Sequence, residues 1–299
     1  MKFPDVVAAA ERISGHVLRT PVLEVSPGLF LKLEQLQHAG SFKVRGAFNR
    51  ILSAGTLPPS GVIAASGGNH GLAVAYAARS LGVRAEIFVP TVTSPVKVAG
   101  LRSLGAEITQ TGAIYSEAAE AAAKRAAETG ALEVHAYDQP EVVAGQGTVG
   151  LEIMEQTGGV DTIVVAVGGG GLIGGITVGA AGASIVGVEP SLAPTMHAAL
   201  EAGAPVPVQV SGVGADALGA SVLGRIAFGI VSAAGVRSVL VSDEAIVAAR
   251  RTLWEERRMV VEHAGAAAYA ALRSGAYVPE SGERVAVVVC GSNTDPATV

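Results

Sequence analysis

Four consecutive glycines and a leucine form the strongest local feature of the sequence: Gly168, Gly169, Gly170, Gly171 and Leu172. They follow the apolar run 162–167, and an apolar helix is expected after them. Glycines let backbone N–H groups converge on an anion, and the beginning of a helix carries partial positive charge, so the pattern favours phosphate binding. It lacks the Lys-Ser/Thr ending of a P-loop and the distal acid of a dinucleotide fingerprint. The alternative is a tight turn between a strand and a helix.

A second loop of small residues connects a predicted strand to a predicted helix: Ser66, Gly67, Gly68, Asn69, His70 and Gly71. Small side chains bring backbone amides close to a ligand at the beginning of a helix, which suits a carboxylate as well as a phosphate. The Asn69 amide can donate and accept, so it could contact a phenolic oxygen of a cofactor. The alternative is a capped helix start without a ligand.

Lys43 follows Ser41 and Phe42 and precedes Gly46. Most isolated lysines are solvated surface residues, and spacing alone favours that interpretation. Catalysis would require the amine to be partly deprotonated, which burial and neighbouring charges can achieve.

Cys290 directly follows the hydrophobic run 285–289. Ligands of open α/β sheets bind beyond the carboxyl ends of the strands. Three strand ends, near Ser66, Gly168 and Cys290, carry small or polar residues, so we expect them to converge on one ligand.

Strand, loop and helix alternate from residue 61 onward, which predicts parallel βαβ units. Strands are predicted at 29–33, 62–65, 85–89, 107–109, 162–167, 184–188 and 285–289, and helices at 4–13, 42–52, 70–81, 116–129 and 243–258. A second series begins after Gly145-Gln146-Gly147. The prediction is an α/β protein with open, mostly parallel sheets flanked by helices. Residues 1–60 and 147–299 would form a large domain, with residues 61–146 inserted as a small domain and no C-terminal regulatory domain.

The composition excludes several classes of protein. The 299 residues carry a formal charge of −5 without a basic block, which argues against nucleic acid as a partner. The single cysteine permits no internal disulfide and fits a reducing compartment, so a cytoplasmic location is expected. The uncharged stretch 162–188 is long enough to span a bilayer, but nine of its residues are glycine. We interpret it as buried strands, a loop and a helix, with no membrane partner.

Taken in this order, the motifs resemble the serine/threonine dehydratase and serine racemase family of pyridoxal-phosphate (PLP) enzymes, which have the fold type II, tryptophan-synthase-β-like architecture. The resemblance covers almost the whole chain and rests on residues 32–34, 41–47, 66–71, 145–148, 168–172, 187–191 and 290. Lys43-Val44-Arg45-Gly46-Ala47 looks like the dehydratase branch, since O-acetylserine sulfhydrylases typically continue with Lys-Asp-Arg.

The resemblance implies a role for each cofactor-site residue. Lys43 would bind PLP covalently and move protons at the substrate Cα and the leaving group, with Phe42 packed beside the cofactor. Asn69 would hydrogen-bond the ring hydroxyl, and the backbone of residues 168–172 would hold the phosphate. Cys290 stands where the family often has serine, facing the pyridine nitrogen.

The implied reaction is β-elimination of a 3-hydroxy amino acid such as L-threonine or L-serine, which gives a 2-oxo acid and ammonia. The alternatives are an amino-acid racemase of the serine or aspartate type and a 3-hydroxyaspartate ammonia-lyase. The family also implies a homodimer. The substrate carboxylate would bind at four residues of one loop: Ser66, Gly67, Gly68 and His70.

Four positions bear on these expectations. Serine racemases have a serine at the position of Gly67, so Gly67 argues against racemisation. The divalent-metal site of the family matches only Glu189, because its aspartate position is Thr195, and we expect no metal. Ala217 occupies a position that is often glycine beside the cofactor ring. Glu262 matches an acidic position near the cofactor, with a solvated acid at a helix end as the alternative.

Overall fold

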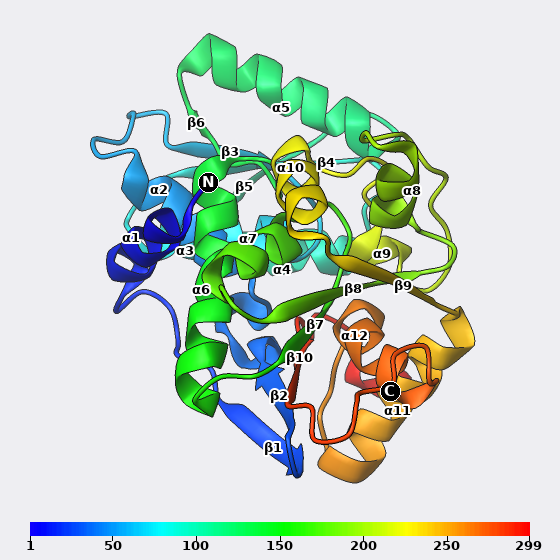
Figure 1. Cartoon of the computed structure of the whole chain (residues 1–299). Coiled ribbons are helices and arrows are strands. Elements are labelled where there is room, and N and C mark those ends of the chain that lie inside the picture. Colours follow the sequence, from blue (N-terminus) through cyan, green and yellow to red (C-terminus); the bar gives the residue numbers. More distant parts are fainter.

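The computed structural model describes residues 1–299, whose strands form two separate sheets (Figure 1). The larger sheet has the order β1-β2-β10-β7-β8-β9, and all its strands are parallel except β1, which is antiparallel to β2. Its strands are β1 (Val22–Ser26), β2 (Leu29–Leu33), β7 (Thr162–Ala166), β8 (Ser184–Pro190), β9 (Arg237–Val241) and β10 (Val285–Val289). The α/β class expected from the sequence is confirmed.

The smaller sheet has the order β5-β4-β3-β6 and is parallel throughout. Its strands are β3 (Val62–Ala65), β4 (Ala85–Val89), β5 (Glu107–Gln110) and β6 (Leu132–Glu133). Each sheet has its own hydrophobic cluster. Helix α2 (Lys43–Ser53) packs Val44, Phe48 and Ile51 into the cluster of the smaller sheet, so Lys43 begins a helix anchored to that sheet.

Helices cover both faces of the larger sheet (Figure 1). Helices α11 (Asp243–Arg257) and α12 (His263–Arg273) lie on one side, and α6 (Pro140–Thr157), α7 (Gly171–Gly179) and α10 (Arg225–Ala234) lie on the other. No helix combines the length and the apolar character that crossing a membrane requires. The remaining helices are α1 (Phe3–Ile13), α3 (Asn69–Ser80), α4 (Pro95–Ser103), α5 (Tyr115–Thr129), α8 (Thr195–Ala202) and α9 (Ala215–Leu218), with short 3₁₀ turns at Glu34–Leu36, His38–Gly40 and Pro296–Thr298.

Helix α6 corrects one expectation from the sequence. Gly145-Gln146-Gly147 was expected to precede a second βαβ series, yet it lies inside this helix. A Cβ atom on Gly145 would lie 2.7 Å from the Arg45 carbonyl oxygen, and one on Gly147 would lie 2.8 Å from the Gly175 carbonyl oxygen. The glycines therefore bring α6 against α2 and α7. The boundary expected between residues 146 and 147 falls within α6, and the division into two domains stays a prediction.

A buried cluster of charges joins β2, α2 and α6. The Arg45 guanidinium donates to both carboxylate oxygens of Glu34, at 2.7 and 2.8 Å, and to the Glu152 carboxylate. The Lys32 amine also donates to Glu152. Arg45 lowers the pKa of Glu34 and offsets the cost of burying that carboxylate, so the pair stays ionised.

Replacing Glu34 with glutamine is therefore expected to lower the free energy of unfolding by about 3 kcal/mol, because the buried Arg45 loses a fully buried counter-charge. Denaturant unfolding followed by circular dichroism measures the change. Glu155→Gln is the matched control, since the Arg19–Glu155 pair is exposed and should contribute about 0.5 kcal/mol or less. Equal effects of the two substitutions would contradict the prediction.

Candidate functional site

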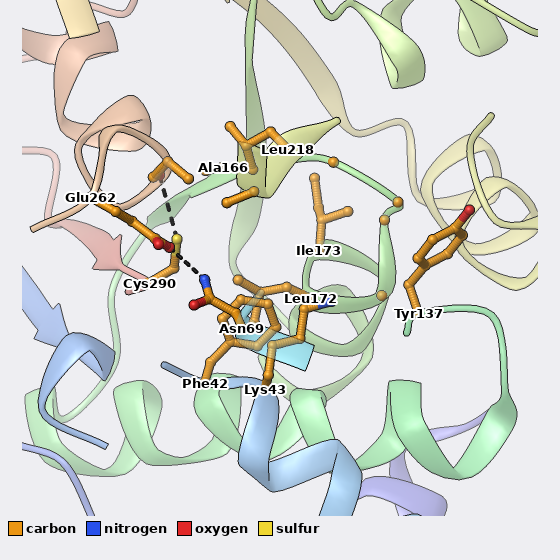
Figure 2. Close-up of a pocket in the computed structure, with 16 residues that line it drawn as sticks. Phe42, Lys43, Asn69, Tyr137, Ala166, Leu172, Ile173, Leu218, Glu262 and Cys290 are labelled. Atoms are coloured by element: carbon orange, nitrogen blue, oxygen red, sulfur yellow. Dashed lines mark hydrogen bonds between the residues drawn. The ribbon is translucent and has the colours of Figure 1, made fainter. Parts of the chain in front are cut away.

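One pocket of about 450 Å³ collects side chains from distant parts of the chain (Figure 2). Lys43 enters it from the beginning of α2, Asn69 from the beginning of α3, and Cys290 from the end of β10. The strand ends that the sequence predicted to converge therefore do so. The lining residues are Phe42, Lys43, Asn69, Tyr137, Ala166, Gly168, Gly169, Gly170, Gly171, Leu172, Ile173, Ala217, Leu218, Glu262, Ala264 and Cys290.

The tetraglycine loop connects β7 to α7 and admits no side chains. A Cβ atom on Gly168 would lie 2.9 Å from the Leu218 Cα, and one on Gly169 would lie 2.3 Å from the Tyr137 ring. Gly170 has a φ of +89°, a left-handed conformation that other residues rarely adopt. The N–H groups of the first turn of α7 have no acceptor within the helix. The loop is thus suited to binding an anionic group through its backbone.

The Lys43 amine is desolvated inside the pocket. Its Nζ donates to the Ala136 carbonyl oxygen at 2.7 Å and lies 5.3 Å from the centre of the Phe42 ring. Burial lowers the pKa of Lys43 to about 8, although the nearby Cys290 and Glu262 act in the opposite direction. The amine is therefore a stronger candidate for a nucleophile or base near neutral pH than an exposed lysine.

Asn69 is held by hydrogen bonds at both ends of its amide. Its Nδ2 donates to Glu262 Oε1 at 2.6 Å, and its Oδ1 accepts from Asn293 Nδ2 at 2.7 Å (Figure 2 shows the first contact). Burial raises the pKa of Glu262 to about 7, against the lowering effect of the Asn69 hydrogen bond. Glu262 is a pocket residue, so its alternative interpretation as a solvated acid at a helix end is wrong.

Cys290 presents a neutral thiol to the pocket. Its Sγ donates to the Ala264 carbonyl oxygen at 3.4 Å (Figure 2). Burial raises the pKa of the Cys290 thiol, so it stays protonated at physiological pH. A neutral thiol offers no negative charge to a ring nitrogen, unlike a carboxylate at the same position.

The loop expected to bind the substrate carboxylate lies next to Asn69, and its side chains do not line the pocket. Ser66 Oγ accepts from the Gly68 N–H at 3.1 Å. The His70 ring is buried and its Nε2 lies 2.8 Å from the Val134 carbonyl oxygen, which requires Nε2 to be the donor. Burial lowers the pKa of His70 to about 3. Any role of His70 in binding a carboxylate therefore falls to its backbone N–H.

Glu189, the weak metal candidate, is already engaged by α8. Its Oε1 accepts from the Met196 N–H at 2.5 Å and its Oε2 from the His197 N–H at 2.8 Å. Burial raises the pKa of Glu189 to about 7, and these backbone N–H groups oppose that effect. Both oxygens satisfy the first turn of a helix, which is a structural role. Across the chain, no group of three or more acidic, histidine or cysteine side chains is placed to hold a metal ion.

The sequence analysis missed Tyr137 and the Ala136 carbonyl. Both follow β6, a strand of only two residues that leaves no alternating pattern to recognise. Tyr137 packs its ring against Gly169, and its backbone carbonyl oxygen would lie 2.9 Å from a Cβ atom on Gly171. The adjacent Asp138 accepts from the Arg225 and Ile226 N–H groups at the beginning of α10. This loop therefore connects the glycine loop, Lys43 and α10.

Comparisons with known proteins agree with this site. An L-threonine ammonia-lyase from Thermotoga maritima is 40% identical, over 97% of this chain and 75% of that protein. The structure of maize serine racemase superposes with a TM-score of 0.92 at 31% identity, covering 99% of this chain and 95% of that one. A threonine deaminase from T.th. gives 0.90 at 35% identity, covering 99% of both chains. The family model described as "Pyridoxal-phosphate dependent enzyme" matches residues 13–291, and the chain therefore belongs to this family.

Proposed function

We propose that this chain is a PLP-dependent ammonia-lyase that converts a small 3-hydroxy amino acid, such as L-threonine or L-serine, to a 2-oxo acid and ammonia. The observation that carries the proposal is the pocket that places the Lys43 amine beside the glycine loop, in a chain 40% identical to an L-threonine ammonia-lyase.

The pocket residues fit the cofactor. The glycine loop, which has no room for a Cβ atom at Gly168 or Gly169, would hold the phosphate through backbone N–H groups. Lys43 would form the covalent link, Asn69 would donate to the ring hydroxyl, and Cys290 would face the pyridine nitrogen. When bound, PLP supplies an electron sink for the bond at the substrate Cα that breaks.

The protein then has two tasks, proton transfer and orientation. The Lys43 Nζ, freed by the incoming substrate amine, takes the proton from the substrate Cα. Its low pKa keeps it competent as a base near neutral pH. The β-hydroxyl departs as water, and hydrolysis of the dehydrated amino acid gives the 2-oxo acid and ammonia. The substrate carboxylate would bind the backbone around Gly67, Gly68 and His70 at the beginning of α3, where first-turn N–H groups are free.

The charges in the pocket support a substrate with a neutral side chain. Among the lining residues only Lys43 and Glu262 are charged, and the remaining wall includes Ile173, Ala217 and Leu218. The β-carboxylate of 3-hydroxyaspartate would find no second cation there and would lie near the Glu262 carboxyl. We therefore favour threonine or serine over 3-hydroxyaspartate.

The racemase alternative rests on the similarity to maize serine racemase. It would need a proton donor on the face of the substrate opposite Lys43. Gly67 has no side chain to provide one, and a Cβ atom there would already lie 3.0 Å from the Thr93 Cγ2. Elimination is the function that the residues of this chain favour.

The direct test is a panel of 3-hydroxy amino acids assayed for ammonia and 2-oxo acid, with chiral analysis of the serine that remains. We expect 2-oxo acid from L-threonine and L-serine, little from 3-hydroxyaspartate, and little D-serine. Substantial D-serine without pyruvate would overturn the proposal in favour of a racemase. A homodimer located in the cytoplasm completes the proposal, and light scattering of the purified protein tests the dimer.

The pKa of Lys43 predicts how cofactor loading depends on pH. The amine must be neutral to attack an aldehyde, and it becomes neutral as the pH rises past about 8. The rate at which cofactor-free protein takes up PLP should therefore rise about tenfold per pH unit below 8 and level off above it. Stopped-flow absorbance between roughly pH 6.5 and 10.5 measures this profile, a range that spans the ordinary lysine pKa. A rate that keeps rising beyond about pH 10 would show an amine with an ordinary pKa.

A further inference from the structure

A chain of side-chain hydrogen bonds links Asn69 to acceptors at both ends. Asn293 Nδ2 donates to the Ala39 carbonyl oxygen at 2.8 Å and to Asn69 Oδ1 at 2.7 Å, and Asn69 Nδ2 donates to Glu262 Oε1 at 2.6 Å. The backbone carbonyl of Ala39 can only accept, and an ionised Glu262 can only accept. The direction of every hydrogen bond between them is therefore fixed.

The same count shows which part of Asn69 remains free. The amide has two N–H donors and one carbonyl oxygen. Asn293 occupies the oxygen and Glu262 occupies one N–H, so one N–H remains. Asn69 lines the pocket, and Figure 2 shows its amide nitrogen directed toward Glu262 and Cys290. The amide can therefore offer the pocket a donor and cannot offer it an acceptor.

Asn293 is held in place by the turn that precedes Lys43. Ala39 has a φ of +55° and Gly40 a φ of +71°, and this left-handed turn places the Ala39 carbonyl against the Asn293 amide. A Cβ atom on Gly40 would lie 2.6 Å from Asn293 Oδ1. The neighbouring Ser292 N–H donates to the Gly40 carbonyl oxygen at 2.9 Å. A flipped Asn293 would set its oxygen against the Ala39 oxygen, which the turn does not allow.

We propose that Asn293 is a positioning residue for the cofactor: it orients the Asn69 amide so that an N–H faces the ring hydroxyl oxygen of PLP. This inference rests on the proposed function, because it assumes that PLP occupies the pocket. Asn293 acts through Asn69 and touches neither the cofactor nor the substrate.

The test measures the dissociation constant for PLP and the absorption maximum of the loaded protein in five forms. These are wild type, Asn69→Ala, Asn293→Ala, Asn293→Asp and the control Ser292→Ala. Ser292 Oγ bonds the Gln35 and Gly40 carbonyl oxygens in the same segment and does not contact Asn69. The melting temperature of each cofactor-free protein reports on folding.

We expect Asn293→Ala to bind PLP about tenfold more weakly and to shift the absorption maximum in the same direction as Asn69→Ala. Asn293→Asp should bind more weakly still, because its carboxylate cannot donate and repels both the Ala39 oxygen and the Asn69 oxygen. A role in packing alone predicts the opposite order, since aspartate has the shape of asparagine. Measurements in about 0.5 M salt should keep the order, because screening removes only the long-range effect of the new charge.

Two results would overturn the inference, and they differ from each other. If Asn69→Ala changes the spectrum while both Asn293 variants behave like Ser292→Ala, Asn293 does not position Asn69 and the proposed function stands. If wild type itself binds no PLP, the proposed function fails and the inference fails with it. Better binding by Asn293→Asp than by Asn293→Ala would also contradict the inference.

Discussion

Replacing Lys43 with alanine is expected to lower kcat by roughly 10⁴-fold and to remove the absorbance band of covalently bound PLP. The amine is the only side-chain group of the pocket that has both a lowered pKa and a nucleophilic nitrogen. Losing a positioned base costs up to about 10⁴-fold in rate. The single hydrogen bond that Lys43 makes is to the Ala136 carbonyl oxygen, so the fold should tolerate the change. Steady-state assays and absorbance spectra of the purified variant measure both effects.

Lys124→Ala is the control for this experiment, because Lys124 is exposed on α5 and forms no ion pair. It should retain wild-type rates and the wild-type spectrum. If Lys43→Ala kept the absorbance band and most of its activity, Lys43 would not be the residue that binds the cofactor. A similar melting temperature for the two variants would show that the loss arises in the site and not from unfolding.

Replacing Gly169 with alanine is expected to weaken PLP binding about 100-fold. The new Cβ atom would lie 2.3 Å from the Tyr137 ring, a distance that real Cβ atoms do not show, so either the ring or the loop must move. Such overpacking costs about 1–3 kcal/mol, and about 2.7 kcal/mol corresponds to a 100-fold change in affinity. Titration of the cofactor-free variant with PLP, followed by fluorescence, gives the dissociation constant.

Tyr137→Ala provides the rescue that makes this test specific. In the double variant the methyl group introduced by Gly169→Ala has room, so most of the affinity lost in the single variant should return. Gly229→Ala is the matched control, because Gly229 is exposed on α10 and a Cβ atom there would have no other atom within 4 Å. It should bind PLP like wild type. A double variant that binds no better than Gly169→Ala would show that the clash with Tyr137 is not the cause.

Periodicity located the regular elements that lie in a uniform environment. The run 285–289 is apolar throughout and is the fully buried strand β10, and the charged stretch 243–258 matches α11 to within one residue. β1 and β9 are strands of the larger sheet that were not predicted, because β1 is mostly exposed and β9 mixes polar with apolar residues. α6 was missed for another reason. Glycines usually end helices, but those of α6 lie where two other helices touch it.

The site could be predicted only in part, because motifs identify backbone loops better than contacts between distant side chains. The tetraglycine loop and Lys43 share one pocket, as expected. The sequence could not show that the His70 ring turns away toward Val134, nor that Asn293 lies against Asn69, 224 positions away along the chain. Such contacts depend on how the two sheets and the segment after β10 come together.

The place of β10 in the larger sheet has a consequence for how the protein matures in the cell. β10 pairs with β2 on one side and with β7 on the other, although it leaves the ribosome after both of them. Until then the β1–β2 hairpin cannot join β7, and Cys290, Ser292 and Asn293 are not in place beside Lys43. A nascent chain paused before residue 285 should therefore be unable to capture PLP. Cofactor loading would then be a late event in biosynthesis, separated in time from the folding of the smaller sheet.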